Sequence, residues 1–296
     1  MSTTLAFDQE DPTDAPVTNT PHERRQIGAN LIIGATIVTA IIAAALVSFV
    51  WTPFDPTNIE ISDRLQGVGW EGHVLGTDHF GRDVLSQLMV GARNTLFIGI
   101  LAVGIALVIG VPLGGLAAAR RGWLEESVMR LSDVMYAFPA ILLAILLSAA
   151  RGPGTSSAMI AIGVAYIPIV ARVTRGAALT VFQTDYITAA HSYGRGKTYV
   201  FVRHVVPNIS SVLIVQATVL FALAILAEAA LSYLGLGAQP PTPSWGRSLF
   251  EAQTFFRLRP ALAFFPGLAI AISVIGINLL GDGIRDYLDP KLAEKS

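Results

Sequence analysis

The chain has 296 residues, of which 53% are hydrophobic and 14% are charged, and its formal net charge at pH 7 is −1. This composition is too apolar for a soluble domain and predicts an integral membrane protein, and the balanced charge leaves no basic face large enough to bind nucleic acid. The absence of cysteine excludes disulfides, thiolate metal sites and cysteine nucleophiles, and the five histidines do not pair at the spacing of metal ligands, so no metal site is expected.

Residues 1–26 are polar, acidic and rich in proline, which predicts a disordered tail on the cytoplasmic side. This tail lacks the basic region and the short apolar core of a signal peptide. The apolar run at 27–51 is therefore expected to stay in the membrane as the first transmembrane helix, since it is long enough to cross roughly 30 Å of hydrocarbon.

Five further apolar stretches predict membrane helices after the first one. They lie near residues 94–119, 131–150, 154–172, 207–233 and 261–281. Most of them approach or exceed the roughly 20 residues that a spanning helix needs. The second and third of these stretches are short and separated by a few residues, so they are expected to form a tight hairpin. The predicted fold class is an all-α membrane protein with six transmembrane helices.

The distribution of basic residues predicts the orientation. With both termini on the cytoplasmic side, 13 of the 20 Lys and Arg residues lie in cytoplasmic segments, which is the bias that membrane insertion favours. This orientation makes 52–93 and 235–260 extracytoplasmic loops, and it places the polar segment 184–208 and the tail 287–296 in the cytoplasm. Dense glycine and proline in 235–246 predict that this part of the outer loop has no regular structure.

Four of the predicted spans contain a proline, at Pro112, Pro139, Pro168 and Pro266. A proline removes one backbone donor and can kink a helix, which membrane helices tolerate when neighbouring groups satisfy the freed carbonyl. These kinks have two readings: they line a translocation cavity that opens and closes, or they serve helix packing alone.

The segment 184–208 is a polar, basic stretch between two long apolar runs. Its small and apolar residues recur at helical spacing, at Tyr186, Ile187, Ala189, Ala190 and Tyr193. Gly194 is placed to end this short helix, and Pro207 stands where the next long helix could start. The pattern predicts a helix, a turn and a second helix along the membrane surface. Taken alone, it fits an interfacial amphipathic helix as well as it fits a protein contact.

Residues 191–198 come close to a phosphate-binding loop, because Gly196, Lys197 and Thr198 match its end. His191 replaces the first glycine of that motif and no predicted strand precedes it, so a nucleotide site is rejected. No set of serine, histidine and carboxylate suggests hydrolysis. The chain is therefore expected to be non-catalytic and to hold no cofactor, and its energy must come from an ATP-hydrolysing partner or from an ion gradient.

Glu228 is a carboxylate bordered by long apolar sequence. An ionisable side chain in a membrane helix is a functional candidate, as a proton site or a contact to a substrate amine, which makes Glu228 a candidate for the translocation path. Gly235 and Gly237 end the helix two turns later, so the alternative is that Glu228 reaches the outer aqueous face or caps neighbouring backbone. The alternative is favoured because the membrane sequence offers Glu228 no basic partner.

The segment 184–208 resembles the EAA loop in permease subunits of bacterial ABC importers, in the dipeptide/oligopeptide branch. The paired alanines, the glycine and the later proline of that loop correspond to Ala189, Ala190, Gly194 and Pro207, and flanking positions resemble Asp185, Tyr186, His204 and Asn208. Thr188 departs from the pattern, because the family often has glutamate there. The resemblance continues in residues 73–96, 131–145, 228–246 and 264–291.

The resemblance implies the fold of a type I ABC importer permease in the inner membrane of a bacterium, with a permease domain at 94–286. The implied partners are a homologous second permease that helix one would wrap, two cytoplasmic ATPase domains that bind ATP and magnesium, and an extracytoplasmic peptide-binding protein. In the family the short helix of the EAA loop docks into a groove on the ATPase. The residues expected to make this coupling contact are Asp185, Tyr186, Ala189, Ala190, Gly194 and Pro207.

The function implied by the resemblance is ATP-driven transport of dipeptides and oligopeptides. A permease for nickel or another small solute is an alternative, because nickel permeases carry much the same motifs. On the residues alone, an ion-driven secondary transporter and a membrane scaffold stay open as functions of another class.

Overall fold

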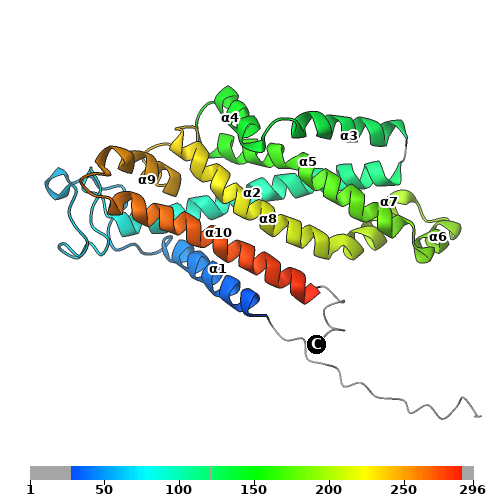
Figure 1. Ribbon diagram of the computed structural model, residues 1–296, viewed down its shortest axis with the longest axis horizontal. Helices are drawn as coiled ribbons and strands as arrows, with labels where there is room; N and C mark the ends of the chain where they lie inside the picture. Colours follow the sequence, from blue (N-terminus) through cyan, green and yellow to red (C-terminus); the bar gives the residue numbers. More distant parts are fainter. Residues whose placement is uncertain (1–27, 121, 289–296) are drawn as a thin grey trace, which may run out of the picture.

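The computed structural model describes residues 28–120 and 122–288. All named elements in these residues are helices, and the five longest run side by side along the longest axis of the molecule (Figure 1). The predicted tail 1–26 and most of the predicted tail 287–296 lie outside the described residues.

Five helices in the described part of the chain are long and apolar enough to cross a membrane. They are α1 (Ala29–Val47), α2 (Val84–Ala119), α5 (Thr155–Phe182), α8 (Val206–Tyr233) and α10 (Ala261–Leu288). A helix pairs its backbone donors and acceptors within itself, which is the condition for lying in hydrocarbon. The predicted all-α membrane fold is confirmed.

The third predicted span, 131–150, is wrong as a single helix. It is replaced by α3 (Trp123–Tyr136) and α4 (Ala140–Arg151), which are bent by 86° relative to each other. Pro139 lies at the break and cannot continue α3, because it has no N–H and disfavours helical backbone in the residue before it. The described residues therefore hold five continuous spans, or six when the bent pair counts as one.

Several helices extend beyond the charge-free stretches that predicted them. α2 begins well before residue 94, because the Asp83 side chain caps it by accepting the Ser86 N–H at 2.7 Å. α5 continues well past residue 172, and its Arg175 pairs with Glu125 of α3. The predicted loop 52–93 therefore ends at residue 83. The extension of α5 shows that a charged residue can continue a helix where a partner of opposite charge neutralises it.

Glycine allows the helices to approach closely at two seams. α2 packs on α5, where a Cβ at Gly114 would overlap the carbonyl oxygen of Ala171, and α1 packs on α10, where a Cβ at Gly34 would overlap the backbone of Leu280. Small residues at such interfaces let membrane helices gain van der Waals contact. One face of α1 packs on α10 of the same chain, and the contact of this helix with a partner subunit, which the resemblance implied, stays a prediction.

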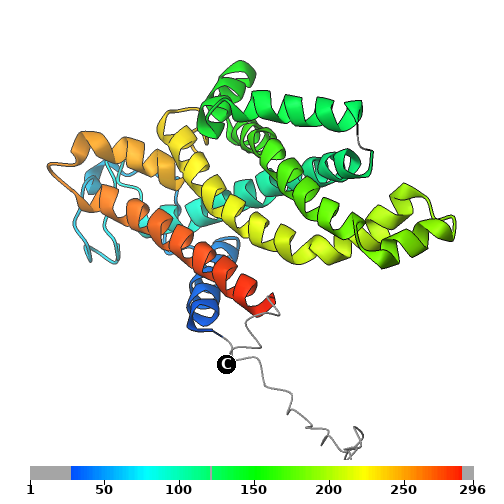
Figure 2. The same ribbon diagram turned by 45° about the vertical axis from the view of Figure 1, so that its right-hand side comes forward.

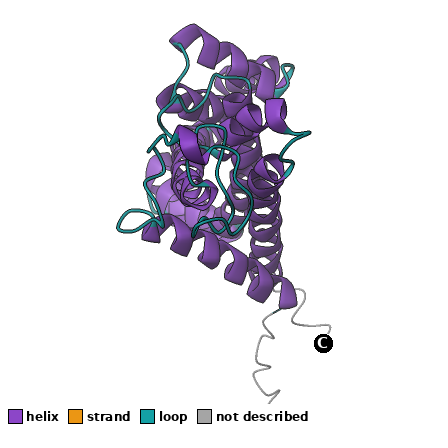
Figure 3. Ribbon diagram, turned by 90° about the vertical axis from the view of Figure 1, so that its left-hand side faces the viewer, coloured by secondary structure: helices purple, strands orange, loops and turns teal. Residues whose placement is uncertain are grey.

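The two ends of the helix bundle carry different structures (Figures 1 and 2). One end holds the short helices α6 (Asp185–Ser192) and α7 (Lys197–Val200). The opposite end holds α9 (Trp245–Ala252) and the loops 52–83 and 234–244, which gather at this end in Figure 3. We call α9 and these two loops the α9 cap.

The α9 cap is more regular than the sequence predicted. Residues 234–244 are irregular, as their glycine and proline content indicated, but α9 then begins because the Ser244 hydroxyl accepts the Arg247 N–H at 3.3 Å and caps the helix. Short 3-10 turns follow at Gln253–Phe255 and lie in the first loop at Ile61–Asp63.

Candidate functional site

α6 matches the short helix predicted in the segment 184–208, and Gly194 ends it. Gly194 has a φ of +75°, in the left-handed region that residues with a Cβ adopt only at a cost. The Arg195 N–H donates to the Ala190 carbonyl at 3.2 Å, and the Tyr193 N–H donates to the Ala189 carbonyl at 3.1 Å. These bonds satisfy carbonyls that the helix end would leave unpaired. The backbone of the chain itself therefore requires a glycine here.

α6 presents most of its predicted coupling residues on its outer surface. Asp185, Tyr186 and Ala189 are exposed, and Ala190 is partly buried. Ile187, by contrast, is 1% exposed and packs in a hydrophobic cluster formed with α2, α5 and α8. α6 is thus anchored by Ile187 and by Ala190, which packs against the same cluster, while the small Ala189 on the exposed face allows another backbone to approach closely.

A hollow of about 460 Å³ lies beside α6, lined by Ala190, Tyr193, Gly194, Arg195, Tyr199 and His204. The Arg195 guanidinium lies over the Tyr199 ring at 4.8 Å, and the His204 ring meets the same ring edge-on at 5.9 Å. The hollow is therefore aromatic and basic, and it adjoins the exposed face of α6. The sequence did not single out Arg195 and Tyr199, although their spacing of four residues in a basic loop is a helical one.

Pro207 lies in the first turn of α8, where the sequence suggested that a long helix could start, but α8 is not separate from α7. The helix already begins at Lys197 and continues to Tyr233 as one apolar element, in which the π-helical turn Phe201–Val205 joins α7 to α8. Pro207 lies two residues after the end of this turn and has no N–H to donate four residues back. The turn is wider than an α-helix, which accommodates a residue that an α-helical ladder excludes. α7 and the membrane helix α8 are therefore mechanically continuous.

Glu228 lies inside the bundle, near the α9 cap. It is 0% exposed, so the expectation that it reaches an aqueous face is wrong. Its carboxylate accepts the Ser232 hydroxyl at 2.8 Å and the Thr95 hydroxyl at 3.2 Å, and the Ser244 side chain also bonds to it. These hydroxyls, which the sequence did not reveal, come from α8, α2 and the residue that caps α9. Glu228 thus joins three elements, and its geometry favours holding them together over contact with a transported solute.

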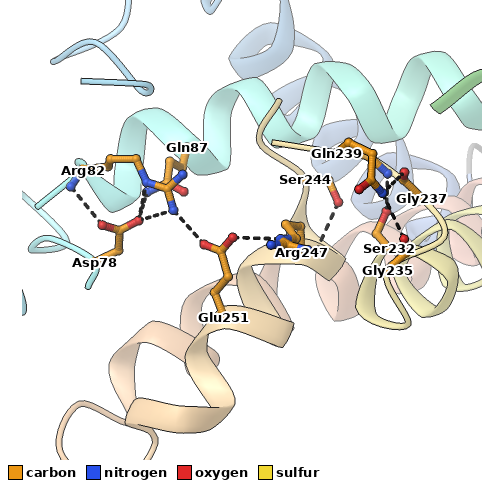
Figure 4. Close-up of polar contacts among 11 residues, drawn as sticks. Asp78, Arg82, Gln87, Ser232, Gly235, Gly237, Gln239, Ser244, Arg247 and Glu251 are labelled. Carbon is orange, nitrogen blue, oxygen red and sulfur yellow. Dashed lines mark hydrogen bonds and ion pairs between the residues drawn. The ribbon is translucent and has the colours of Figure 1, made fainter. Parts of the chain in front are cut away.

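A network of charged and amide side chains joins α9 to the loop 52–83 within the α9 cap and reaches α2 through Gln87 (Figure 4). Glu251 of α9 accepts from Arg82 at 2.7 Å and from Arg247 at 2.8 Å. Arg82 also donates to Asp78 at 2.7 Å, and Gln87 of α2 donates to the same carboxylate oxygen at 2.9 Å. The charged side chains are only 10 to 24% exposed. Because removing one partner of a buried ion pair leaves an uncompensated charge, the ion pairs hold α9 on the loop 52–83, and the Gln87 bond links this loop to α2.

Asp78, His79 and Glu251 place three groups that could hold a metal ion within 4.8 Å of one another. Both carboxylates already accept hydrogen bonds from Arg82, so a metal cation would have to displace a guanidinium from a largely buried pair. Burial lowers the pKa of His79, and the nearby charge of Asp78 opposes that shift. The arrangement suits a structural contact better than a metal centre.

An apolar hollow of about 350 Å³ lies between α4, α5 and α8. Alanines and larger aliphatic side chains line it, and Tyr166 of α5 is its polar residue. Pro168 lies in the same stretch of α5. A gating role for this proline and for Pro112 and Pro266, which also lie inside helices, stays a prediction.

This bundle of membrane helices, with an exposed short helix at one end and an ordered cap at the other, defines the class of membrane permease subunits. Two structures of the MetNI methionine ABC transporter in inward-facing conformations have this fold, with TM-scores of 0.57 and 0.56. Each is 19% identical and covers 69% of this chain and 97% of its own. At this identity the likeness shows the fold alone, and it confirms the predicted ABC importer permease fold.

Three curated relatives match nearly the whole chain. A dipeptide transport system permease protein DppC of Alkalihalophilus pseudofirmus is 40% identical over 261 residues, 88% of this chain and 86% of the relative. A glutathione transport system permease protein GsiD of Pectobacterium atrosepticum is 40% identical over 270 residues, 91% and 90% of the two chains. A di/tripeptide transport system permease protein DppC of Pseudomonas aeruginosa is 42% identical over 264 residues, 88% and 87%. The chain belongs to the family of binding-protein-dependent transport system inner membrane components, which matches residues 110–294.

Proposed function

We propose that this chain is the permease subunit of an ATP-driven importer that carries dipeptides and oligopeptides across the bacterial cytoplasmic membrane. The observation that carries the proposal is identity of 40% or more to relatives named for dipeptide, di/tripeptide and glutathione transport, over most of both chains. Glutathione is itself a small peptide, so the three names share one class of solute.

The proposed assembly contains a second homologous permease, two ATPase domains that bind ATP and magnesium, and an extracytoplasmic peptide-binding protein. The family description supports the binding protein. In the proposed orientation the α6 end faces the cytoplasm and the α9 cap faces outward, which the distribution of basic residues supports, since 13 of the 20 lie in segments at the cytoplasmic side. Both termini then lie in the cytoplasm.

The ATPase contact is proposed to lie on α6 and the adjoining hollow. Asp185, Tyr186 and Ala189 are exposed there, and the partly buried Ala190 lines the hollow, so these four residues would touch the ATPase. Gly194 and Pro207 would act through the backbone, because Gly194 ends α6 and Pro207 follows the π-helical turn. The small exposed side chain of Ala189 would let α6 lie close to the floor of a groove on the ATPase, which is the docking that the family resemblance implies.

The test is ATP-dependent uptake of labelled dipeptide into liposomes that hold this chain with its second permease and ATPases, with the binding protein added at the side of the α9 cap. Ala189→Asp places a charge on the exposed face of α6 and should abolish uptake while the protein stays in the membrane. Thr188→Glu is the matched control, because the adjacent Thr188 is also exposed and the family often has glutamate there. Uptake by the Ala189→Asp complex at the unmodified rate would refute the ATPase contact, and no uptake of any peptide by the unmodified complex would refute the function.

A further inference from the structure

Lys197, at the start of the continuous helix Lys197–Tyr233, reaches the end of α2. Its ammonium group donates to the carbonyl of Ala119, the last residue of α2, at 3.1 Å. The last four carbonyls of a helix have no partner within it, and a cation there interacts favourably with the helix dipole. Lys197 belongs to the segment 191–198, which resembles the end of a phosphate-binding loop in sequence. In the structure its side chain caps the C-terminus of α2.

A second contact lies one helical turn along both elements. A Cβ at Gly115 of α2 would overlap the ring of Phe201, so the ring lies directly on the α2 backbone. Gly115 and Ala119 are four residues apart on α2, and Lys197 and Phe201 are four residues apart on their helix, so each pair shares one helix face. Between them, Val200 is 0% exposed. The two helices thus meet through two matched contacts.

The position of these contacts relative to the π-helical turn decides what they do. Lys197 and Phe201 lie at or before the start of the turn Phe201–Val205, on the side of α6. Such turns are uncommon, occur mostly as single turns within α-helices and are frequent at functional sites. A displacement of α6 therefore meets the contacts with α2 before it crosses the turn into α8.

We propose that Lys197 and Phe201 are positioning residues that transmit movement of α6 to α2, alongside the direct route through the π-helical turn into α8. The inference rests on the proposed function, in which an ATPase moves α6. α2 and the continuous helix Lys197–Tyr233 both run from these contacts toward the α9 cap. Near the cap, Thr95 of α2 bonds to Glu228 of α8. Driving both helices at one end moves both sides of that contact together.

The first experiment measures ATP hydrolysis by the assembled complex with and without peptide-loaded binding protein. Phe201→Ala and Lys197→Met should each lower the stimulation of ATP hydrolysis by the loaded binding protein about fivefold or more. About fivefold is the lower end of the effects by which two distant sites in a protein influence each other. Lys197 is exposed, so Lys197→Met is compatible with folding even if Phe201→Ala is not. Val202→Ala, at an exposed position in the same turn, is the matched control and should leave stimulation unchanged.

The second experiment replaces the contact by a covalent link. The chain has no cysteine, so Gly115→Cys with Phe201→Cys introduces its only thiols, and the space left by the ring accommodates both. With cysteine-free partner chains, this double variant should be poorly stimulated when reduced and regain stimulation after a short bifunctional thiol reagent joins the two helices. The single variants should not recover. A merely structural contribution of Phe201 to folding predicts no such recovery.

The outcomes separate this inference from the function on which it rests. Absence of stimulation in the unmodified complex would overturn the proposed function. Stimulation in the unmodified complex together with unchanged stimulation in Phe201→Ala and Lys197→Met would overturn the inference alone. Loss of stimulation that the covalent link does not restore would also overturn it, because the link keeps α2 and the π-helical turn together.

Discussion

Glu251→Gln should loosen the α9 cap, because it removes the charge that two arginines face. The Glu251 carboxylate lies 2.7 Å from Arg82 and 2.8 Å from Arg247, and the three side chains are 11 to 24% exposed. Removing one partner of a buried ion pair costs about 3–5 kcal/mol, since the remaining charge is left without compensation. Arg82 keeps Asp78 as a second partner. We therefore expect the lower part of that range, about 3 kcal/mol.

The matched control is Glu126→Gln on the surface of α3. The Glu126–Arg130 pair has the same four-residue spacing as Glu251–Arg247, but its side chains are 60% and 77% exposed, and exposed pairs contribute about 0–1 kcal/mol. Hydrogen exchange of the amides in 52–83 and α9, measured on the protein in mild detergent, reports the free energy of opening the cap. If Glu251→Gln leaves that protection unchanged, or lowers it no more than Glu126→Gln does, the reasoning is refuted.

Glu228→Ala removes the acceptor of three buried hydroxyls and opens a cavity, so it should lower the free energy of unfolding by about 3 kcal/mol. Glu228→Gln should lower it by about 1 kcal/mol, and denaturation followed by tryptophan fluorescence measures both losses. Equal losses would contradict the bonding described here. Gly194→Ala forces a Cβ into left-handed backbone at a cost of about 1–2 kcal/mol, and Gly194→Asn should cost less. The alanine variant should therefore be cleaved faster in the α6 loop than the asparagine variant in limited proteolysis. Identical cleavage rates of the two variants would count against this reasoning. Burial lowers the pKa of His79 below its ordinary value of 6.5, so the unfolded chain binds this proton more readily. Protection of the α9 cap from hydrogen exchange should therefore be full above about pH 6.5 and fall as the pH drops below it. This protection should depend less on pH in His79→Gln. The same pH dependence in His79→Gln as in the unmodified protein would exclude His79 as the cause.

Apolar stretches located the long helices, but not their ends. A charged residue ends an apolar stretch in the sequence, yet Arg172 and Arg175 continue α5 because Asp133 and Glu125 of α3 neutralise them. These partners lie far away in the chain, and no local pattern points to them. Pro139 shows the same limit, because a proline either kinks or breaks a helix according to how its neighbours satisfy the backbone.

The short helix α6 was predictable because its determinants are local. Apolar and small residues at helical spacing form it, and Gly194 ends it through bonds within the same turn. The surroundings of Glu228 were not predictable, because Thr95 lies 133 residues away in the sequence and Ser244 belongs to a loop rich in proline. A buried carboxylate can be located from the sequence, but the tertiary fold decides which donors it meets.

The glycine seam between α1 and α10 has a consequence for the order in which this protein assembles. A Cβ at Gly283 would overlap Leu31, so the contact joins residues about 250 positions apart. At the roughly 5–20 residues that a ribosome adds each second, α1 waits on the order of 10–50 s before its partner is made. During that time the other helices can already pack on one another. The contact between α1 and α10 is therefore made late in synthesis, and a chain interrupted before α10 leaves its first helix with its contacts to α2 but without the glycine seam.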